Sequence, residues 1–524
     1  MIEIIDAGAV LCLFFYLLLV LKKELHMLQL NSYFNTRYIK WYKENFRSRC
    51  DIIKALVVLS CVLSGCMDYW LFPLAGILLS AAGAVALIKQ KAKKKLDFTH
   101  RAARLFVMAI LLPAAALAVT FTVTQNIRPA AWPLAAFIAF SFPVMLFANT
   151  LMRPLETLIN RWYINDAGKK IKNCPHLTVV AVTGSYGKTS VKHFLQNILS
   201  EQYNVLITPG SFNTTLGVVR TVREQLQPIH EVFIVEMGAK RAGDVAEICR
   251  IVRPKYGVIT AVGAQHLETF GTVANVKKAK LEILSALPAG GGGFINAADI
   301  APGDLPADVK APVVSFGVGK DADYDARNIV YTAKGMSFDV YRSGEKYLTL
   351  ETALLGEHNV SNLLACCAVA CTLGVEKYKI EKAVKSIRAV EHRLEVKPLP
   401  NGVTVIDDAF NSNPVGSKMA LEALKRMEGK RKIIITPGMI ELGAEEAERN
   451  YAFGQAIAGN CDIAVLVGIH RTLPIQEGIK AAGFPEGNLA VCKNLTEANN
   501  YVKSIMQPGD VVLYENDLPD TFNE

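Results

Sequence analysis

The sequence has little that would support a disulfide-bonded or a repetitive protein. Its 524 residues include eleven cysteines, but these are scattered and no CxxC pair occurs. Cys366, Cys367 and Cys371 fall in an Ala/Val-rich segment that is typical of a buried helix. We therefore expect reduced core thiols in a cytoplasmic environment. No internal repeat or low-complexity tract is visible, which excludes a repeat array.

The first apolar stretch, residues 4–21, lacks the features of a cleaved signal peptide. No basic region precedes it and no small-residue cleavage site follows it, so we predict a retained membrane span. The chain is 51% hydrophobic with a mean hydropathy of +0.25, which is high for a soluble enzyme. Further stretches of near-spanning length are 52–68, 70–88, 105–124 and 130–150. These stretches hold few polar residues of the kind that mark a transport pathway, so we do not expect a transporter.

The formal net charge of +9 is unevenly distributed. Basic residues gather in the segments 22–54 and 89–104, whereas the alternate loops hold almost none apart from Arg128. Because basic loops stay in the cytoplasm, five spans put the N-terminus outside and everything after Arg153 inside. The basic excess then indicates membrane orientation, and we expect no nucleic-acid partner.

From Leu177 onward the pattern changes to strands that alternate with helices. Buried-strand candidates are 177–182, 232–236, 256–262, 403–407, 432–436, 463–467 and 511–514. Strands that alternate with helices predict parallel sheets covered on both faces. The stretch 313–352 differs, with short strands and turns that suggest a small antiparallel insert.

The strongest motif is Thr183-Gly-Ser-Tyr-Gly-Lys-Thr-Ser190, which lies between the strand 177–182 and a predicted helix near 188–200. Glycines let a backbone wrap phosphate oxygens, and the start of a helix offers N–H groups and a positive dipole end. Lys188 would reach the β and γ phosphates, and the hydroxyl of Thr189 would bind Mg²⁺. The complete GxxxxGK[ST] spacing is not met, because Val182 stands where the first glycine would be. The alternative is a glycine-rich turn with an exposed lysine.

Glu236, His266 and Lys280 are candidate groups beside this motif. Glu236 and His266 each end a predicted strand, and the carboxyl ends of parallel strands meet at the ligand crevice. A carboxylate and an imidazole there could hold Mg²⁺. Taken singly, each residue has a plainer interpretation: a helix-cap carboxylate, a core histidine and a solvated helix face.

In chain order, the segments GSYGKTS, VEMG, AQHLETFG, KAKLE, GEHNVSN, EHRLE and DDAFNSNP make the chain similar to the Mur ligases. These ligases build the peptide stem of bacterial cell-wall precursors. The resemblance covers roughly residues 177–515 and is closest to the MurF branch, which adds D-alanyl-D-alanine to a UDP-muramoyl tripeptide. The family also includes the folylpolyglutamate synthases, so its shared core specifies the chemistry better than the substrate.

The resemblance implies ATP and two Mg²⁺ ions as cofactors. Lys188, His266 and Lys280 would be catalytic, and Lys280 matches a lysine that is carbamylated in several members. The implied nucleotide contacts are Gly184, Ser185, Gly187, Lys188, Thr189, Ser190, Asn359, Asn362, Arg393 and Asp408, of which the two asparagines match adenine-side contacts and Asp408 a ribose contact. The implied metal ligands are Thr189, Glu236, His266 and Lys280. Asn411, Asn413 and Pro414 complete the MurF-like DDxxNxNP pattern.

The implied fold is an α-helical transmembrane region over residues 1–165, followed by two α/β domains. Residues 166–392 would form a P-loop ATPase domain with a parallel sheet, and residues 393–524 a Rossmann-like domain that closes over the nucleotide. In the implied reaction, ATP phosphorylates a substrate carboxylate, and an amine then displaces phosphate from the acyl phosphate. Positioning and charge neutralisation would carry most of the catalysis.

Three departures from the MurF pattern put the substrates in doubt. Membrane spans take the place of the domain that holds the UDP-sugar. Ala409-Phe410 stands where a Ser-Tyr pair is usual, and the acidic segment 513–520 replaces a Lys-Gly-Ser type segment, which would favour a cationic group. The segment 210–217 still resembles the family's substrate-side loop.

We therefore predict a multi-pass protein of the bacterial inner membrane that joins an amino acid or dipeptide to a carboxylate-bearing peptide or muramoyl-type substrate. Two alternatives remain: a ligase that makes another polymer, such as γ-linked polyglutamate, and a nucleotide-binding module that acts with a partner membrane protein. The spans would serve as a plain anchor or would bind membrane lipid, a lipid-linked substrate or that partner.

Overall fold

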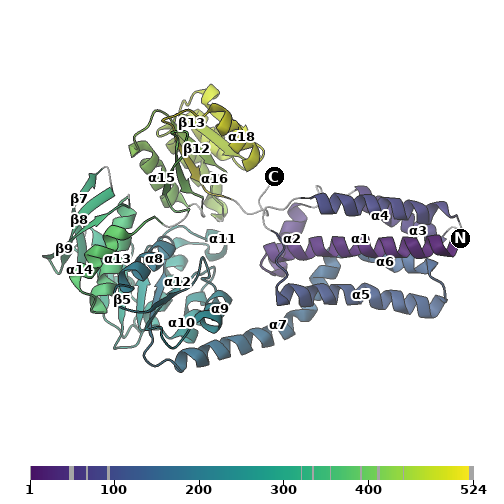
Figure 1. The fold of residues 1–524 in the computed structure, drawn as a ribbon, viewed down its shortest axis with the longest axis horizontal. Coiled ribbons are helices and arrows are strands. Elements are labelled where there is room, and N and C mark those ends of the chain that lie inside the picture. Colours follow the sequence, from purple (N-terminus) through teal and green to yellow (C-terminus); the bar gives the residue numbers. More distant parts are fainter. Residues whose placement is uncertain are drawn as a thin grey trace. The chain divides into compact units, whose positions relative to one another are not determined.

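The computed structural model describes residues 2–45, 52–66, 69–90, 95–319, 321–332, 335–354, 356–389, 392–409, 413–440 and 442–517. These residues divide into two compact units, a helical unit up to Asn160 and an α/β unit from Arg161 to Asp517. Figure 1 shows the helices and strands of each unit.

The helical unit is a bundle in which α1 contacts α4, α5 and α6. The elements of this unit are α1 (Ile2–Leu30), α2 (Asn35–Glu44), α3 (Ile52–Cys66), α4 (Leu71–Lys89), α5 (His100–Thr124), η2 (Arg128–Ala130), α6 (Ala131–Ala139) and the first part of α7 (Ser141–Lys172). Gly83 of α4 lies against Tyr16 of α1, since a Cβ there would come within 2.6 Å of the Tyr16 ring. A small residue thus lets these two helices approach closely.

Three helices of this unit are long and apolar enough to cross a membrane: Ile4–Leu30, Leu71–Lys89 and His100–Thr124. They confirm the predicted stretches 4–21, 70–88 and 105–124 as apolar helices of spanning length. For the predicted stretch 52–68, the described helix has 15 residues, Ile52–Cys66, whereas a span needs about 20. Residues 67 and 68 lie outside the described residues, so this stretch stays a prediction as a span.

The predicted span 130–150 is broken. The chain bends by 81° between Ala131–Ala139 and Ser141–Lys172, so these two helices count together as at most a fourth span. The sequence explains the break, because Pro143 has no N–H to donate to the carbonyl of Ala139 in a continuous helix.

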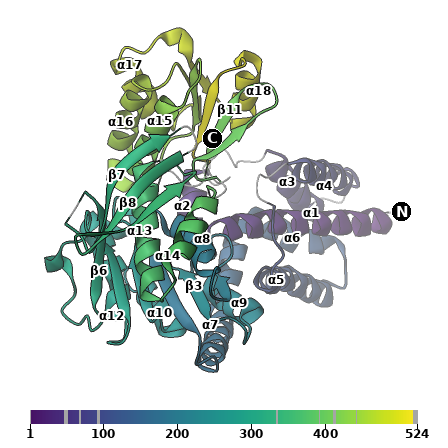
Figure 2. The same ribbon diagram turned by 60° about the vertical axis from the view of Figure 1, so that its left-hand side comes forward.

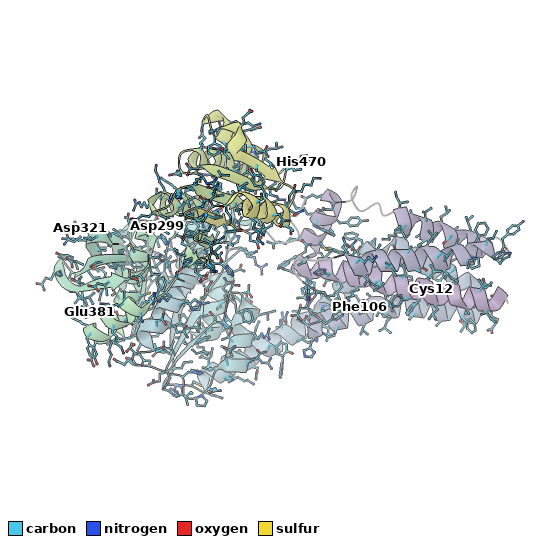
Figure 3. All side chains as sticks on the ribbon, turned by 45° about the horizontal axis from the view of Figure 1, so that its top comes forward. Cys12, Phe106, Asp299, Asp321, Glu381 and His470 are labelled. Carbon is cyan, nitrogen blue, oxygen red and sulfur yellow. The ribbon has the colours of Figure 1, made fainter. Side chains whose placement is uncertain are left out.

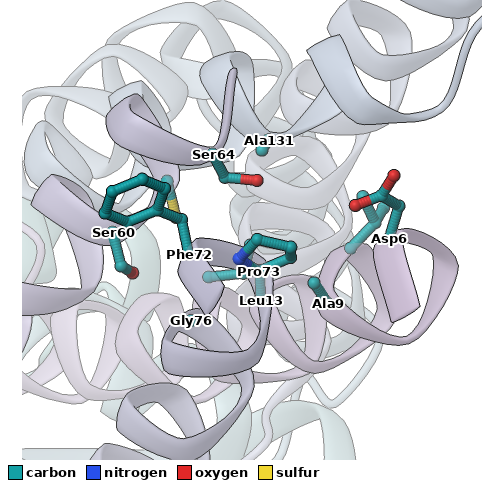
Figure 4. A pocket seen from close by; sticks show the side chains of 11 residues that line it. Asp6, Ala9, Leu13, Ser60, Ser64, Phe72, Pro73, Gly76 and Ala131 are labelled. Atoms are coloured by element: carbon teal, nitrogen blue, oxygen red, sulfur yellow. The ribbon is translucent and has the colours of Figure 1, made fainter. Parts of the chain in front are cut away.

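A small pocket in this unit is lined by side chains from α1, α3, α4 and α6 (Figure 4). Its polar lining consists of Asp6, Ser60 and Ser64, and the other lining groups are apolar or sulfur-bearing. The hydroxyl of Ser60 donates to the Val57 carbonyl of its own helix at 2.8 Å. In the part of the chain that the structure describes, this pocket contains none of the predicted catalytic residues.

The first part of the α/β unit is built on a nine-stranded sheet with strand order β2-β3-β1-β4-β5-β6-β7-β8-β9. Its strands are β1 (Thr178–Thr183), β2 (Val205–Ile207), β3 (Val232–Glu236), β4 (Tyr256–Ile259), β5 (Gly292–Asn296), β6 (Val313–Val318), β7 (Tyr324–Thr332), β8 (Gly335–Arg342) and β9 (Glu345–Thr352). Its helices are the end of α7, α8 (Lys188–Leu199), α9 (Thr215–Gln225), α10 (Asp244–Val252), α11 (Leu267–Phe270), α12 (Val273–Ser285), η3 (Pro302–Asp304), α13 (Glu357–Thr372) and α14 (Lys377–Ser386).

Helices cover both faces of this sheet (Figures 1 and 2). One core contains side chains of α8, α13 and α14, and a second contains side chains of α9, α10 and α12. The helix α13 is apolar from Leu363 to Cys371, where Cys366 and Cys367 are fully buried free thiols, as predicted, and Cys371 is a partly buried one.

The sheet is mixed: the predicted parallel pairing ends at β7, and antiparallel strands follow within the stretch 313–352, where the sequence suggested them. The strands pair in parallel from β2 to β7, but β7, β8 and β9 are antiparallel. A tight turn at Ser343 and Gly344, both with positive φ, joins β8 to β9. Such a short connection can join only antiparallel strands. The expected insert at 313–352 therefore extends the main sheet.

The second part of the α/β unit has a six-stranded sheet with strand order β10-β11-β15-β12-β13-β14. Its elements are β10 (Glu395–Pro398), β11 (Thr404–Asp408), α15 (Pro414–Arg426), β12 (Lys432–Thr436), η4 (Gly443–Glu445), α16 (Glu446–Ala458), β13 (Ile463–Val467), α17 (Leu473–Ala481), η5 (Glu486–Asn488), β14 (Leu489–Cys492), α18 (Leu495–Ile505) and β15 (Val511–Glu515). Five strands are parallel, and β10 is an antiparallel edge strand. Helices α15, α16 and α17 pack on one face and α18 on the other.

Candidate nucleotide and metal site

The predicted phosphate loop lies between the end of β1 and the start of α8, in a space that admits only glycine at two positions. Gly184 has φ of +151° and Gly187 has φ of +79°. A Cβ at Gly184 would lie 2.0 Å from the Thr260 hydroxyl oxygen, and a Cβ at Gly187 would lie 2.5 Å from Oδ1 of Asn362. Both the left-handed backbone and the lack of space therefore require these glycines.

The segment after β4 holds this loop in place. The N–H of Ser185 donates to the Ala261 carbonyl at 2.7 Å, and the Tyr186 hydroxyl donates to the Ala264 carbonyl at 3.0 Å. Residues 260–262 were predicted as strand, but β4 ends at Ile259. The segment is itself anchored by Asp299, whose carboxylate accepts the Val262 N–H at 2.9 Å and which is labelled in Figure 3.

Lys188 folds back over the loop. Its Nζ donates to the carbonyls of Gly184 and Ser185 at 2.6 and 3.0 Å. Burial lowers the pKa of Lys188 to about 8, although Glu236 opposes this shift. Thr189 and Ser190 occupy the first turn of α8, where backbone N–H groups have no intrahelical acceptor. The predicted residues thus surround a short cationic cradle that suits phosphate oxygens.

Glu236 is buried at the end of β3, next to β1 in the sheet. Its Oε2 lies 3.0 Å from Nζ of Lys192, and its Oε1 accepts from the Asn213 side chain at 3.0 Å. Burial alone would raise the pKa of Glu236, but the ammonium groups of Lys192 and Lys188 outweigh burial and hold it below its ordinary value. An ionised carboxylate beside a phosphate cradle fits Mg²⁺, which binds few protein oxygens and uses phosphates and water for the rest.

Lys192 is a residue of this site that the sequence analysis missed. It lies one helical turn after Lys188 on α8 and is 0% exposed. The sequence does contain a signal, because residues four apart on a helix share a face. Its partner Glu236, however, comes from a different strand, and only the sheet brings the two together.

Lys280 and His266 are placed by α12 and by the turn before α11. Lys280 is 1% exposed, which rules out a solvated helix face. Burial and the charge of Lys188 hold the pKa of Lys280 well below its ordinary value. His266 has a left-handed backbone with φ of +53°. No group of three or more His, Cys, Asp or Glu side chains suited to a metal occurs among the described residues.

Asn359 and Asn362 lie at the start of α13. The Asn362 amide donates to the Asn359 side chain at 3.5 Å, and Asn362 also faces Gly187 of the phosphate loop. The structure thus brings this helix start to the phosphate side of the candidate site. The adenine contact expected of both asparagines stays a prediction.

Arg393 and Asp408 lie near each other at the start of the second sheet. The N–H of Leu394 donates to Asp408 Oδ1 at 3.2 Å. Burial raises the pKa of Asp408 to about 6, although the Arg393 charge opposes this shift. Arg393 also interacts electrostatically with Glu236. Glu236 therefore experiences cations from both parts of the α/β unit.

Two other predictions about this part have structural outcomes. Asn413 caps α15, since its side-chain oxygen accepts the N–H groups of Val415 and Gly416 at 3.2 and 2.8 Å. Asn411 lies outside the described residues. Glu515 of the acidic segment 513–520 is 1% exposed and accepts from the Thr436 hydroxyl at 2.9 Å. This carboxylate therefore connects two strands of the second sheet. Residues 518–520 of that segment also lie outside the described residues.

Comparison with known proteins identifies the family of the α/β unit. The Mur ligase middle domain matches residues 182–370, and the Mur ligase, glutamate ligase domain matches residues 392–514. The UDP-N-acetylmuramoyl-tripeptide–D-alanyl-D-alanine ligase of Escherichia coli K12 is 32% identical over 311 residues, which are 59% of this chain and 67% of that protein. The chain belongs to the Mur ligase family, whose members are ATP-dependent ligases.

Within this family the chain is similar to MurF. A crystal structure of MurF from Acinetobacter baumannii superposes with a TM-score of 0.62 and 26% identity, covering 69% of this chain and 78% of that one. MurF from Thermotoga maritima in complex with ADP superposes with a TM-score of 0.60 and 25% identity, covering 68% and 80%. The chain spans between 58% and 70% of the length of the curated relatives it matches.

Proposed function

We propose that this protein is a membrane-anchored amide ligase that joins an amino acid or dipeptide to a carboxylate of a muramoyl-type peptide at the expense of ATP. The observation that carries the proposal is the grouping of Lys188, Lys192 and Glu236 around a phosphate cradle that requires Gly184 and Gly187. The similarity to D-alanyl-D-alanine-adding ligases makes that dipeptide the first amine to test.

The residues of the chain have separate tasks in this reaction. The N–H groups at the start of α8 and the ammonium of Lys188 bind the β and γ phosphates and neutralise charge as the γ-phosphoryl group moves to the carboxylate. Glu236 and Thr189 would hold Mg²⁺, which supplies further neutralisation when bound. Asp408 and Arg393 would bind the ribose and phosphates from the second sheet, and residues 393–524 would close over the nucleotide.

A second metal would need Lys280 and His266. The neutral amine is the form that reacts with CO₂ to give a carbamate, and the buried position of Lys280, which lowers its pKa, favours that form. A carbamate would replace a lysine ammonium by an anionic oxygen donor beside Lys188. We propose this modification for Lys280. Mass spectrometry after trapping with labelled bicarbonate would show the label on Lys280 of the wild type and none on Lys280→Met.

The apolar helices of the first unit support membrane anchoring. Three of them are long and apolar enough to cross a membrane. Because ATP is available in the cytoplasm, the α/β unit must face that side. The basic segments 22–54 and 89–104 fit the same side. Placing both basic segments inside requires α3 to cross with α4 as a hairpin, although α3 is short. Membrane lipid is then a partner of this unit.

The test is phosphate release from ATP by the detergent-purified chain. Each reaction would contain one carboxylate and one amine, drawn from UDP-muramoyl peptides, D-alanyl-D-alanine, single amino acids and glutamate. Release should require both substrates and should be lost in Lys188→Ala. The matched control Lys382→Ala removes a surface lysine that pairs with Glu201 and should change nothing.

The outcomes separate the alternatives. Release with a muramoyl peptide and an amine supports the proposal and identifies the substrates. Release with glutamate as both carboxylate and amine would replace it with a polyglutamate-type ligase. ATP binding without turnover of any pair would contradict the proposed activity and favour a nucleotide-binding module.

A further inference from the structure

Glu236 and Lys192 form a fully buried ion pair at the place where a metal ion would bind. The two side chains are 1% and 0% exposed, and their charged atoms lie 3.0 Å apart. Such a pair is costly to bury and gains little stability over apolar residues of similar size. A pair in this position therefore suggests a role other than stability.

The same two residues hold the loop that precedes α9, which we call the 209–213 loop. Nζ of Lys192 donates to the Gly210 carbonyl at 2.5 Å, and the Asn213 amide donates to Glu236 Oε1 at 3.0 Å. The Asn213 carbonyl in turn accepts the Gly238 N–H at 2.7 Å. At least two of the bonds that hold the loop thus depend on the Lys192–Glu236 pair.

The loop itself faces solvent. Gly210, Ser211 and Phe212 are exposed, and the Arg220 guanidinium lies 5.5 Å from the centre of the Phe212 ring. An exposed loop with a cation and an aromatic ring beside the phosphate cradle is well placed to contact a substrate carboxylate.

We propose that Lys192 is a positioning residue that occupies Glu236 in the metal-free protein, and that metal binding to Glu236 releases the 209–213 loop. Oε2 of Glu236 faces the Lys192 ammonium at 3.0 Å and Oε1 accepts from the Asn213 amide, so a metal ion at this carboxylate competes with Lys192, Asn213 or both. A displaced Lys192 stays beside the phosphate cradle, because α8 carries both, and a displaced Asn213 loosens the loop. Metal occupancy and loop mobility are thereby coupled.

This inference rests on the proposed nucleotide and metal site but not on the identity of the carboxylate or the amine. The test therefore uses ADP and Mn²⁺ with the full-length chain in detergent and involves no turnover. Mn²⁺ binding is measured by electron paramagnetic resonance. Hydrogen exchange of the peptide that contains the 209–213 loop is measured with and without Mn²⁺–ADP.

In the wild type, Mn²⁺–ADP should speed exchange in the 209–213 loop by about tenfold or more, because a loop that Lys192 and Asn213 no longer hold opens more often. Lys192→Met should exchange at the fast rate before metal is added. It should also bind Mn²⁺ at least fivefold more tightly, because a competing cation is gone. A purely structural lysine would loosen the loop on removal but would not tighten Mn²⁺ binding.

Asn213→Ala guards against a folding defect, since it removes one bond to the loop and leaves the buried charges paired. It should speed loop exchange without metal and leave Lys192 as the competitor, so Mn²⁺ affinity should change less than in Lys192→Met. The exposed Lys382→Met is the matched lysine control and should behave like the wild type.

The results distinguish failure of the inference from failure of the proposed site. Normal Mn²⁺–ADP binding by the wild type with no change in loop exchange overturns the coupling and leaves the site intact. Weaker or unchanged Mn²⁺ binding by a folded Lys192→Met also overturns the coupling. No Mn²⁺–ADP binding by the wild type overturns the metal site and the coupling together.

Discussion

Each unit contains an ion pair with a buried carboxylate, and the two pairs differ in how the cation meets that carboxylate. In the helical unit, Nε and Nη2 of the partly exposed Arg104 donate to the two oxygens of Glu156, at 2.7 and 2.9 Å. In the α/β unit, the Lys192 ammonium forms an ion pair with Oε2 of Glu236, and the Asn213 side-chain amide donates to Oε1. A bidentate fork is rigid and satisfies the carboxylate, whereas a lysine and an amide can be exchanged for a metal ion. The Arg104–Glu156 pair thus joins two helices, whereas the Lys192–Glu236 pair lies at the proposed metal site.

The largest expected effect concerns catalysis in the α/β unit, where Lys188 lies near the Lys192–Glu236 pair. Lys188→Ala should lower phosphate release by about 10³-fold, because one fixed positive group facing the transferred phosphoryl is lost. The Lys192–Glu236 pair should persist, so thermal unfolding and exchange in the 209–213 loop should stay near those of the wild type. A variant that unfolds instead would show that Lys188 is structural.

The Arg104–Glu156 pair should stabilise the helical unit by joining α5 to α7. Arg104→Met removes the bidentate partner of the buried Glu156 carboxylate and should lower the free energy of unfolding by about 2 kcal/mol, less than for a fully buried pair because Arg104 is partly exposed. Adding Glu156→Leu should recover most of that loss, and phosphate release per folded molecule should stay normal. Calorimetry of the purified chain measures the first effect. An Arg104→Met protein of wild-type stability would remove the distinction between the two pairs.

The pH dependence of stability tests the charge at Asp408. Its folded-state pKa of about 6 lies above the value of about 4 in an unfolded chain, so the folded protein binds this proton more tightly. The stability that protonation adds is present near pH 4.5 and is lost as the pH rises through 6. Relative to Asp408→Asn, the wild type should therefore lose about 2 kcal/mol between pH 4.5 and 7.5. Parallel pH profiles of the two proteins would contradict the raised pKa.

The smallest effect concerns the helix that carries Lys280. The Thr272 hydroxyl accepts the Asn275 N–H at 3.2 Å and caps α12. Thr272→Ala should cost about 1 kcal/mol, whereas Thr272→Ser should cost little because serine keeps the cap. Chemical denaturation compares the two variants. If they lost the same stability, the methyl group rather than the hydroxyl would be the stabilising part.

Much of the phosphate cradle could be predicted because its determinants are local. The glycines, Lys188 and Thr189 are contiguous, and the strand before them and the helix after them follow from short-range patterns. The role of Asn413 at the start of α15 is local as well, since an asparagine before Pro414 is a helix-cap signal. Lys192 of α8 was missed because its partner, Glu236, lies on β3, which follows much later in the chain.

In the helical unit, the sequence predicted the positions of the apolar helices better than their ends. Hydropathy located the apolar stretches, and three of them are helices of spanning length. Hydropathy could not show that the chain bends by 81° between α6 and α7. That bend depends on where individual backbone hydrogen bonds stop, and a window average does not contain that information.

The linear order of residues was enough to establish the alternation of strands and helices, the phosphate loop and the Mur ligase chemistry. It could do so because these features depend on contiguous residues and on the periods of helix and strand. Only the tertiary structure decided that Lys192 meets Glu236, that Lys280 is buried, that Glu515 faces inward and that β7 to β9 extend the main sheet. Each of these depends on segments far apart in the chain, which the packing of the sheets and helices brings together.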